Sequence, residues 1–192
     1  MSCVVYTIHN VIPLAPGQKE RGTVDLNAFV HQLRWLNRLG VRFIPMSDFH
    51  AWLEGEKKIP RQAAVLTFDD ALISIYEHAF PFLKQQAIPF TIFVIAGLIG
   101  CESNFSKRRP EQSQRHLDAE QLTTLIKSGL VEIGAHSHNH RNLTHIEGDE
   151  LWQELRAAKD LLEDCISQAP VYCGDSRSTR VVRFYLVRPL GH

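Results

Sequence analysis

One short stretch, residues 65–70, most constrains how this chain can fold. Four apolar or strand-forming residues there run directly into two adjacent carboxylates, Asp69 and Asp70. A continuous run of this kind predicts a buried strand of a parallel sheet. Such strands end at the carboxyl edge of the sheet, where α/β proteins build their sites. Two neighbouring carboxylates at that edge repel each other and lose solvation, so we expect a bound cation to stabilise them.

Strand and helix patterns alternate along the rest of the chain. Short apolar runs predict strands at residues 4–8, 41–46, 63–70, 90–96, 130–135 and 171–172. Apolar residues at helical spacing predict helices over residues 26–36, 48–53, 72–83, 117–127 and 151–162. Helix ends are expected at residues suited to capping or breaking, which are Asp25, Gly40, Ser47, Pro81 and the pair Thr144 and Glu147. This alternation predicts right-handed βαβ units around a mainly parallel sheet or barrel.

The domain organisation follows from where this periodicity stops. A chain of 192 residues is long enough for one domain that buries roughly 70% of its unfolded surface. From Cys173 to His192 the apolar periodicity of the earlier segments is absent. We therefore expect one domain over residues 1–172 and an atypical carboxyl-terminal tail over residues 173–192.

Charge and composition exclude several classes of partner and location. Lys plus Arg (21) equals Asp plus Glu (21), so no net field favours nucleic acid or an anionic membrane. No apolar run approaches the roughly 20 residues of a membrane span. The first residues lack the basic and apolar regions of a signal peptide, so a cytoplasmic location is the default expectation. The four cysteines form no CxxC pair, which favours free thiols.

Two histidines follow another predicted strand and are the natural partners of the carboxylate pair. His136 and His140 are four residues apart, which lets two imidazoles and one carboxylate converge on a single ion. Three protein ligands leave positions open for water and substrate, as in catalytic sites. The plainer alternatives are that the histidines only cap a loop and that an aspartate only caps a helix. If one aspartate binds the ion, the other is free to act as a base.

Other histidines are less informative. His9 ends the first predicted strand on the expected site edge, and we leave its role open. His138 and His145 have no assigned role and are expected to face solvent.

The two motifs resemble a known family. Leu-Thr-Phe-Asp-Asp at 66–70 and His-Ser-His-Asn-His at 136–140 are similar to the first two motifs of the polysaccharide deacetylases, which form the NodB homology domain or carbohydrate esterase family 4. The flanking segments 8–13, 89–94 and 142–144 also resemble that family. The likeness covers residues 4 to 172.

This resemblance implies a fold, a reaction and roles for named residues. The fold would be a distorted (β/α) barrel, here incomplete at the carboxyl terminus. The reaction would be metal-dependent removal of N- or O-acetyl groups from an acetylated polysaccharide or oligosaccharide. Asp70, His136 and His140 would hold a divalent ion, expected to be zinc, and Asp69 would be the general base. Ser137 would support the loop that carries His136 and His140, here called the histidine loop. No residue is assigned to substrate binding.

The chain departs from the family pattern in two places. Ala71 replaces the glycine that follows the aspartates, which is harmless only if its φ stays below zero. The later motifs, including the histidine that supplies a general acid, have no convincing match after Tyr172. Activity is therefore expected to be impaired. A catalytically inactive sugar- or metal-binding remnant is one alternative interpretation. A non-haem iron oxygenase is another, disfavoured because such enzymes are β-sandwiches.

Overall fold

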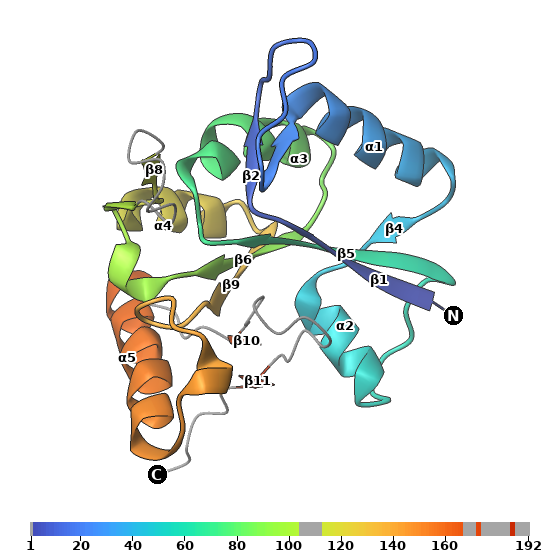
Figure 1. The fold of residues 1–192 in the computed structure, drawn as a ribbon. Helices are drawn as coiled ribbons and strands as arrows, with labels where there is room; N and C mark the ends of the chain where they lie inside the picture. Colours follow the sequence, from blue (N-terminus) through green and yellow to red (C-terminus); the bar gives the residue numbers. More distant parts are fainter. Residues whose placement is uncertain (1, 104–112, 167–171, 174–184, 187–192) are drawn as a thin grey trace.

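The computed structural model describes residues 2–103, 113–166, 172–173 and 185–186 (Figure 1). Its strands in chain order are β1 (Ser2–Ile8), β2 (Asn10–Ile12), β3 (Thr23–Asp25), β4 (Arg42–Phe43), β5 (Gln62–Asp69), β6 (Phe90–Val94), β7 (Glu102–Ser103), β8 (Gln114–Arg115), β9 (Val131–Ala135), β10 (Tyr172–Cys173) and β11 (Tyr185–Leu186). Its α-helices are α1 (Leu26–Arg38), α2 (Met46–Leu53), α3 (Phe80–Gln85), α4 (Ala119–Lys127) and α5 (Gly148–Ile166). Shorter helical turns are η1 (Ile75–Ala79), η2 (Ala96–Leu98) and η3 (Leu143–His145).

The main sheet confirms the predicted parallel α/β class. Its strands lie in the order β1-β5-β6-β9-β10-β11, and β4 also pairs with β5. Every pair in this sheet is parallel except β10 with β11. Because β5, β6 and β9 run in the same direction, the residues that follow them reach the same edge. The described strands leave the sheet open, with β1 and β11 at its two ends.

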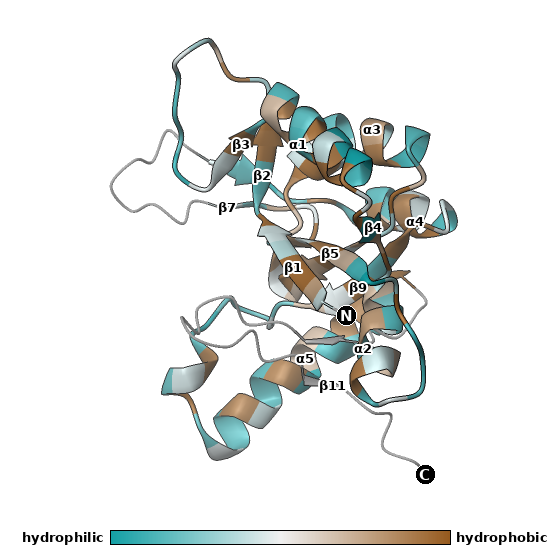
Figure 2. Cartoon of the chain, turned by 90° about the vertical axis from the view of Figure 1, so that its right-hand side faces the viewer, coloured by the Kyte–Doolittle hydropathy of each residue, from teal (hydrophilic) through white to brown (hydrophobic). Residues whose placement is uncertain are grey.

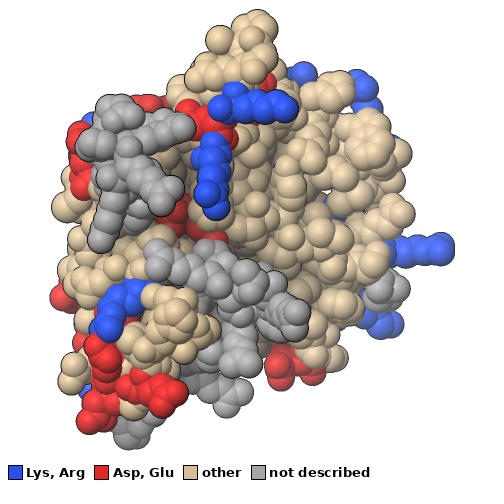
Figure 3. Space-filling view, viewed as in Figure 1, with Lys and Arg blue, Asp and Glu red and all other residues tan. Residues whose placement is uncertain are grey.

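Helices cover the strands from two sides. In Figures 1 and 2, α1, α3 and α4 lie above the sheet, whereas α2 and α5 lie below it. The stripes of hydrophobic and hydrophilic residues along α5 in Figure 2 are those of an amphipathic helix. No helix among the described residues is long and apolar enough to span a membrane. On the face that Figure 3 shows, basic and acidic side chains are interspersed.

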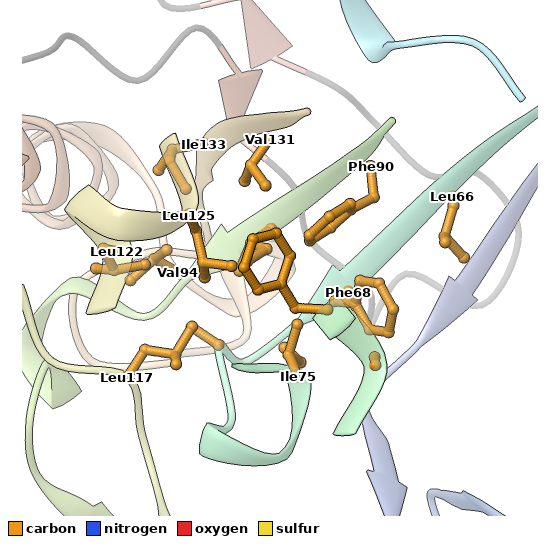
Figure 4. Close-up of a cluster of buried hydrophobic side chains, with 14 of the residues drawn as sticks. Leu66, Phe68, Ile75, Phe90, Val94, Leu117, Leu122, Leu125, Val131 and Ile133 are labelled. Atoms are coloured by element: carbon orange, nitrogen blue, oxygen red, sulfur yellow. The ribbon is translucent and has the colours of Figure 1, made fainter. Parts of the chain in front are cut away.

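The alternation of side chains along β5 divides the core. Leu66 and Phe68 are fully buried in the larger cluster, part of which Figure 4 shows. The ring of Phe68 lies 5.6 Å from that of Phe90, edge to face, a contact worth about 0.5–1.5 kcal/mol beyond burial. Val65 points to the other face and packs with Met46 and other residues in a smaller cluster. β5 is therefore buried on both faces from Ala63 to its last residue, Asp69.

Several predicted helix ends are confirmed. The Asp25 carboxylate accepts hydrogen bonds from the backbone N–H groups of Leu14 and Ala28, both at 3.0 Å, and these bonds lower its pKa. Gly40 follows α1 with φ of 82°, as a helix-ending glycine should. A π-helical turn precedes α3, and Pro81 lies in the first turn of α3, so the predicted division of this helix is also correct.

Two predicted caps and one strand length are wrong. Helix α2 begins at Met46, one residue before Ser47, and has no side-chain cap. Thr144 belongs to η3, which Asn142 caps, while α5 starts only at Gly148. The strand predicted over residues 41–46 is reduced to β4, because the chain turns into α2 immediately afterwards.

The described part of the tail belongs to the sheet. β10 pairs with β9 in parallel, and β11 pairs with β10 in an antiparallel arrangement. The expected boundary after residue 172 therefore falls within β10, and residue 171 of the predicted strand lies outside the described residues. The division into domain and tail stays a prediction, since residues 174–184 and 187–192 also lie outside them.

Candidate metal centre

Three of the four predicted site residues converge at the carboxyl edge of the sheet. Asp70 Oδ1 lies 3.5 Å from His136 Nε2 and 3.4 Å from His140 Nε2. The candidate ligand atoms of the three residues all lie within 4.8 Å of one another. Asp70 and His136 are buried, and His140 is half-buried. The residues are far apart in the sequence, and the parallel order of β5, β6 and β9 brings them together.

The donor set fits a divalent ion. Two imidazole nitrogens and one carboxylate oxygen are typical ligands for zinc and related metals. Asp70 Oδ1 is buried and accepts no hydrogen bond from the described residues. A buried carboxylate oxygen is costly unless a charge or a hydrogen bond compensates it. A cation shared with the two imidazoles would supply that compensation.

Both ligand loops contain left-handed backbone. The φ angles are 70° at Asp70, 55° at Ala71, 63° at Ser137 and 55° at His140, and Ala87 is the remaining described non-glycine residue with positive φ. Each such residue costs about 1–2 kcal/mol relative to ordinary backbone, and strain of this kind tends to collect at functional sites. Alanine at position 71 would be harmless only with a negative φ, and its φ is positive. A glycine there would adopt the same turn without strain.

The histidine loop is anchored to β6 and η2 mainly through its backbone. His136 N–H donates to the Val94 carbonyl at 2.7 Å, and the Ser137 carbonyl accepts from Ala96 N–H at 3.1 Å. Ser137 thus supports the loop through its backbone carbonyl, whereas its buried hydroxyl has no hydrogen bond to the described residues. The His138 carbonyl accepts from Gly97 N–H at 3.0 Å.

The remaining histidines of this region meet the sequence expectation only in part. His145 is exposed, as predicted, but His138 is half-buried. A Cβ at Gly97 would lie 2.7 Å from the His138 carbonyl oxygen, so this close approach requires a glycine.

Glu154 of α5 holds the middle of the histidine loop and was not identified from the sequence. This buried carboxylate accepts from the backbone N–H of Asn139 at 2.5 Å and from its side-chain amide at 3.0 Å. Burial alone would raise the pKa of Glu154, but the hydrogen bonds from Asn139 together with the backbone and charge of His138 outweigh it, and the pKa is lowered. Its place in the apolar stripe of α5, among Leu151, Leu155 and Leu162, is the signal that could have revealed it.

His116 is a second residue that the sequence did not reveal. It is fully buried, and its Nδ1 lies 2.7 Å from the backbone carbonyl oxygen of Asp70. Burial lowers the pKa of His116, which favours the neutral imidazole. No local pattern marks it, because it follows a polar segment and its partner is 46 positions away.

Asp69, the fourth predicted residue, faces a different neighbour. It is buried, and its Oδ2 lies 3.9 Å from Nε2 of His9, whose side chain is 42% exposed. The parallel register of β1 and β5, which pairs Ile8 with Phe68, carries the two residues to the edge side by side. The structure thus brings His9, left open by the sequence, to the site.

The fold and the cluster together define an α/β protein with a candidate metal centre at the carboxyl edge of its sheet. The family model described as polysaccharide deacetylase matches residues 56–175, more than half of the chain. The chain therefore belongs to the polysaccharide deacetylase family, a class of hydrolases. This confirms the resemblance carried by the two motifs.

Curated relatives match over most of this chain. The poly-beta-1,6-N-acetyl-D-glucosamine N-deacetylase of Staphylococcus aureus (strain MRSA252) is 30% identical over 141 residues, which are 72% of this chain and 46% of that protein. The protein of the same name from Staphylococcus epidermidis is 31% identical over 134 residues, or 69% of this chain and 44% of that protein. The chain thus spans less than half the length of these relatives.

Solved structures share the fold. IcaB from Ammonifex degensii superposes with a TM-score of 0.77 at 27% identity, over 89% of this chain and 72% of that chain. A de-N-acetylase from Aggregatibacter actinomycetemcomitans superposes with a TM-score of 0.73 at 18% identity, over 88% and 77% respectively, and supports the fold alone. These similarities confirm the predicted fold class and disfavour the β-sandwich of the oxygenase alternative.

Proposed function

We propose that this chain is a metal-dependent hydrolase that removes acetyl groups from an acetylated polysaccharide. The observation that carries the proposal is the convergence of Asp70, His136 and His140 beside a second buried carboxylate, Asp69. The names of the staphylococcal relatives support an N-acetylated glucosamine polymer as the substrate class. Bond breakage would then occur between the acetyl carbon and the amide nitrogen of a sugar.

Each residue has a distinct role in this proposal. Asp70, His136 and His140 would hold a divalent ion, for which zinc suits the donor set. Such an ion polarises an acetyl carbonyl and lowers the pKa of water when it is bound. Asp69 lies next to the ligand Asp70 and would take the proton of the water that attacks the carbonyl carbon.

His9 supplies a candidate for the second proton transfer. Its Nε2 is 3.9 Å from Asp69 Oδ2, and its side chain is 42% exposed, so the ring lies beside Asp69 and is open to solvent. A protonated His9 would donate a proton to the leaving nitrogen, so that the products are acetate and a free amine. This assignment gives the reaction a general acid from the amino-terminal strand, without drawing on the tail.

The decisive experiment measures acetate release from oligomers of β-1,6-linked N-acetylglucosamine. The purified chain is assayed with added zinc, after chelation, and after zinc is restored. Zinc-dependent release supports the proposal. The alternative of an inactive sugar- or metal-binding remnant, favoured by the missing motifs after Tyr172, predicts bound metal but no acetate under any of these conditions. That result would reject the deacetylase activity for this chain.

A further inference from the structure

The turn that carries Asp70 is held from outside by a segment that comes much later in the chain. Leu117 N–H donates to the Ala71 carbonyl at 2.8 Å, and Leu72 forms an isolated antiparallel bridge with His116. His116 adds a side-chain hydrogen bond to the Asp70 carbonyl. Two successive carbonyl groups of this turn are therefore fixed by two successive residues, His116 and Leu117.

The hydrogen bonds of His116 define its orientation. The Asp70 carbonyl can only accept, so Nδ1 of His116 must carry the proton and donate at 2.7 Å. In the neutral ring Nε2 is then an acceptor, and the Ser103 hydroxyl lies 2.5 Å from it. Ser103 therefore donates to His116, and His116 donates to Asp70. This chain of bonds fixes both the tautomer and the plane of a fully buried ring.

Strain explains why the turn needs such support. Asp70 and Ala71 are consecutive non-glycine residues with φ of 70° and 55°. Strained backbone persists only where its surroundings over-determine it. If the turn relaxed, the Asp70 carboxylate would move relative to the two histidine nitrogens, which now lie 3.5 and 3.4 Å from Oδ1. The geometry of the ligand set thus depends on the backbone of one ligand.

We propose that His116 is a positioning residue for the metal centre, acting through the backbone carbonyl of Asp70. The inference rests on the proposed metal site and adds to it a group that touches neither metal nor substrate. It also explains how alanine is tolerated at position 71. The hydrogen bonds from His116 and Leu117 hold the strained turn in place, whereas a glycine at position 71 would adopt the turn without strain.

The test measures the zinc dissociation constant of the full chain by competition with a chelating dye. His116→Leu removes the donor at similar volume and is expected to weaken zinc binding by about 10- to 100-fold, the usual effect of losing a group that orients a ligand. His116→Asn keeps an N–H near the position of Nδ1 and is expected to recover most of the affinity. His145 is an exposed histidine outside the site, so His145→Leu is the matched control and should leave the zinc dissociation constant unchanged.

A second substitution separates positioning from general packing. Ala71→Gly removes the strain at that residue, so it should reduce the loss caused by His116→Leu when the two are combined. A packing defect alone would not respond to Ala71→Gly. The inference would be overturned if the zinc affinity of His116→Leu stayed within about twofold of the unaltered chain. It would also be overturned if His116→Leu caused the same loss with and without Ala71→Gly.

The outcomes also distinguish this inference from the proposed function. An unaltered chain that binds no zinc rejects the metal site itself. An unaltered chain that binds zinc, with no effect at His116, rejects the positioning role alone. If His116→Leu does not fold, Ser103→Ala decides in its place, because it frees the ring to turn. A weakened zinc affinity there supports the role of His116, and an unchanged one overturns it.

Discussion

At the scale of single residues, backbone conformation separates the two adjacent aspartates. Asp69 is the last residue of β5, whereas Asp70 has the left-handed φ of 70°. This change of backbone turns one carboxylate towards His9 and the other towards His136 and His140. Two identical side chains can thus take different chemical roles at neighbouring positions.

The first prediction concerns the ligands. We expect Asp70→Ala and His140→Ala each to abolish most zinc binding, because two remaining ligands hold a divalent ion poorly. Elemental analysis of the purified variants measures the metal content, and His145→Ala serves as the control. Full metal content in both variants would contradict the ligand assignment.

The second prediction concerns the proton transfers. Asp69→Asn should keep the metal and lower acetate release by about 10²–10⁴-fold, the usual cost of removing a general base. His9→Ala should also keep the metal and slow the reaction, since it removes the proposed acid. Metal content and rate are measured on the same samples. Loss of metal in Asp69→Asn with retention in Asp70→Asn would exchange the two aspartate roles.

At the scale of elements, α5 fastens the histidine loop in two ways that differ in burial. The buried Glu154 accepts two hydrogen bonds from Asn139, whereas Glu150 forms an ion pair with Arg141 in which both side chains are substantially exposed. Hydrogen bonds to a charged group contribute about 1.5–3 kcal/mol, but exposed ion pairs contribute about 0–1 kcal/mol. We infer that Glu154 stabilises the folded chain more than Glu150 does.

The third prediction compares these two carboxylates. Glu154→Ala should lower the free energy of unfolding by about 1.5–3 kcal/mol, because it removes hydrogen bonds to a charged group, and Glu150→Ala by less than about 1 kcal/mol. Urea denaturation at neutral pH measures both. Equal effects of the two substitutions would contradict the role given to Glu154.

The stabilisation that Glu154 provides should depend on pH, and the direction follows from its lowered pKa. The pKa of Glu154 is lowered from its ordinary value of 4.5, so the folded state binds its proton more weakly than the unfolded state does. The stabilisation is therefore present above pH 4.5 and is lost as the pH falls through the folded pKa. The difference in stability between the unaltered chain and Glu154→Ala should shrink over that range.

At the scale of the whole molecule, the sheet continues past the predicted domain boundary. β10 and β11 extend it beyond β9, on the side of the sheet opposite to β1. The sequence nevertheless lacks the later family motifs there. The tail therefore contributes strands to one end of the sheet. The proposed general acid, His9, follows β1 at the opposite end.

The fourth prediction tests the tail. We expect replacement of residues 173–192 by the carboxyl-terminal segment of an intact family member to raise the melting temperature and the rate of acetate release. The reason is that the described strands form an open sheet, and the edge strand of an open sheet presents unpaired backbone groups. Calorimetry and the acetate assay measure the two effects. An unaltered chain that already melts cooperatively and matches the replaced one in rate would contradict this expectation.

Much of the fold could be predicted from local signals. Apolar runs and helical periodicity located the main strands and helices, and Asp25, Gly40 and Pro81 marked real element ends. The errors arose where tertiary contacts override local preference. Ser47 lies inside α2 because the helix starts at Met46, with Pro45 at the N-cap position two residues before the predicted cap. The N–H of Ser47 donates instead to the carboxylate of Glu132 in β9.

The sequence by itself determined which residue types lie at the ends of β5 and β9, and so the candidate metal ligands Asp70, His136 and His140. Only the tertiary structure decided that His9 faces Asp69, that His116 holds the Asp70 carbonyl and that Glu154 holds Asn139. The physical reason is one of range. Propensity and periodicity act between neighbours in the chain, whereas the order and register of strands depend on packing across the entire core.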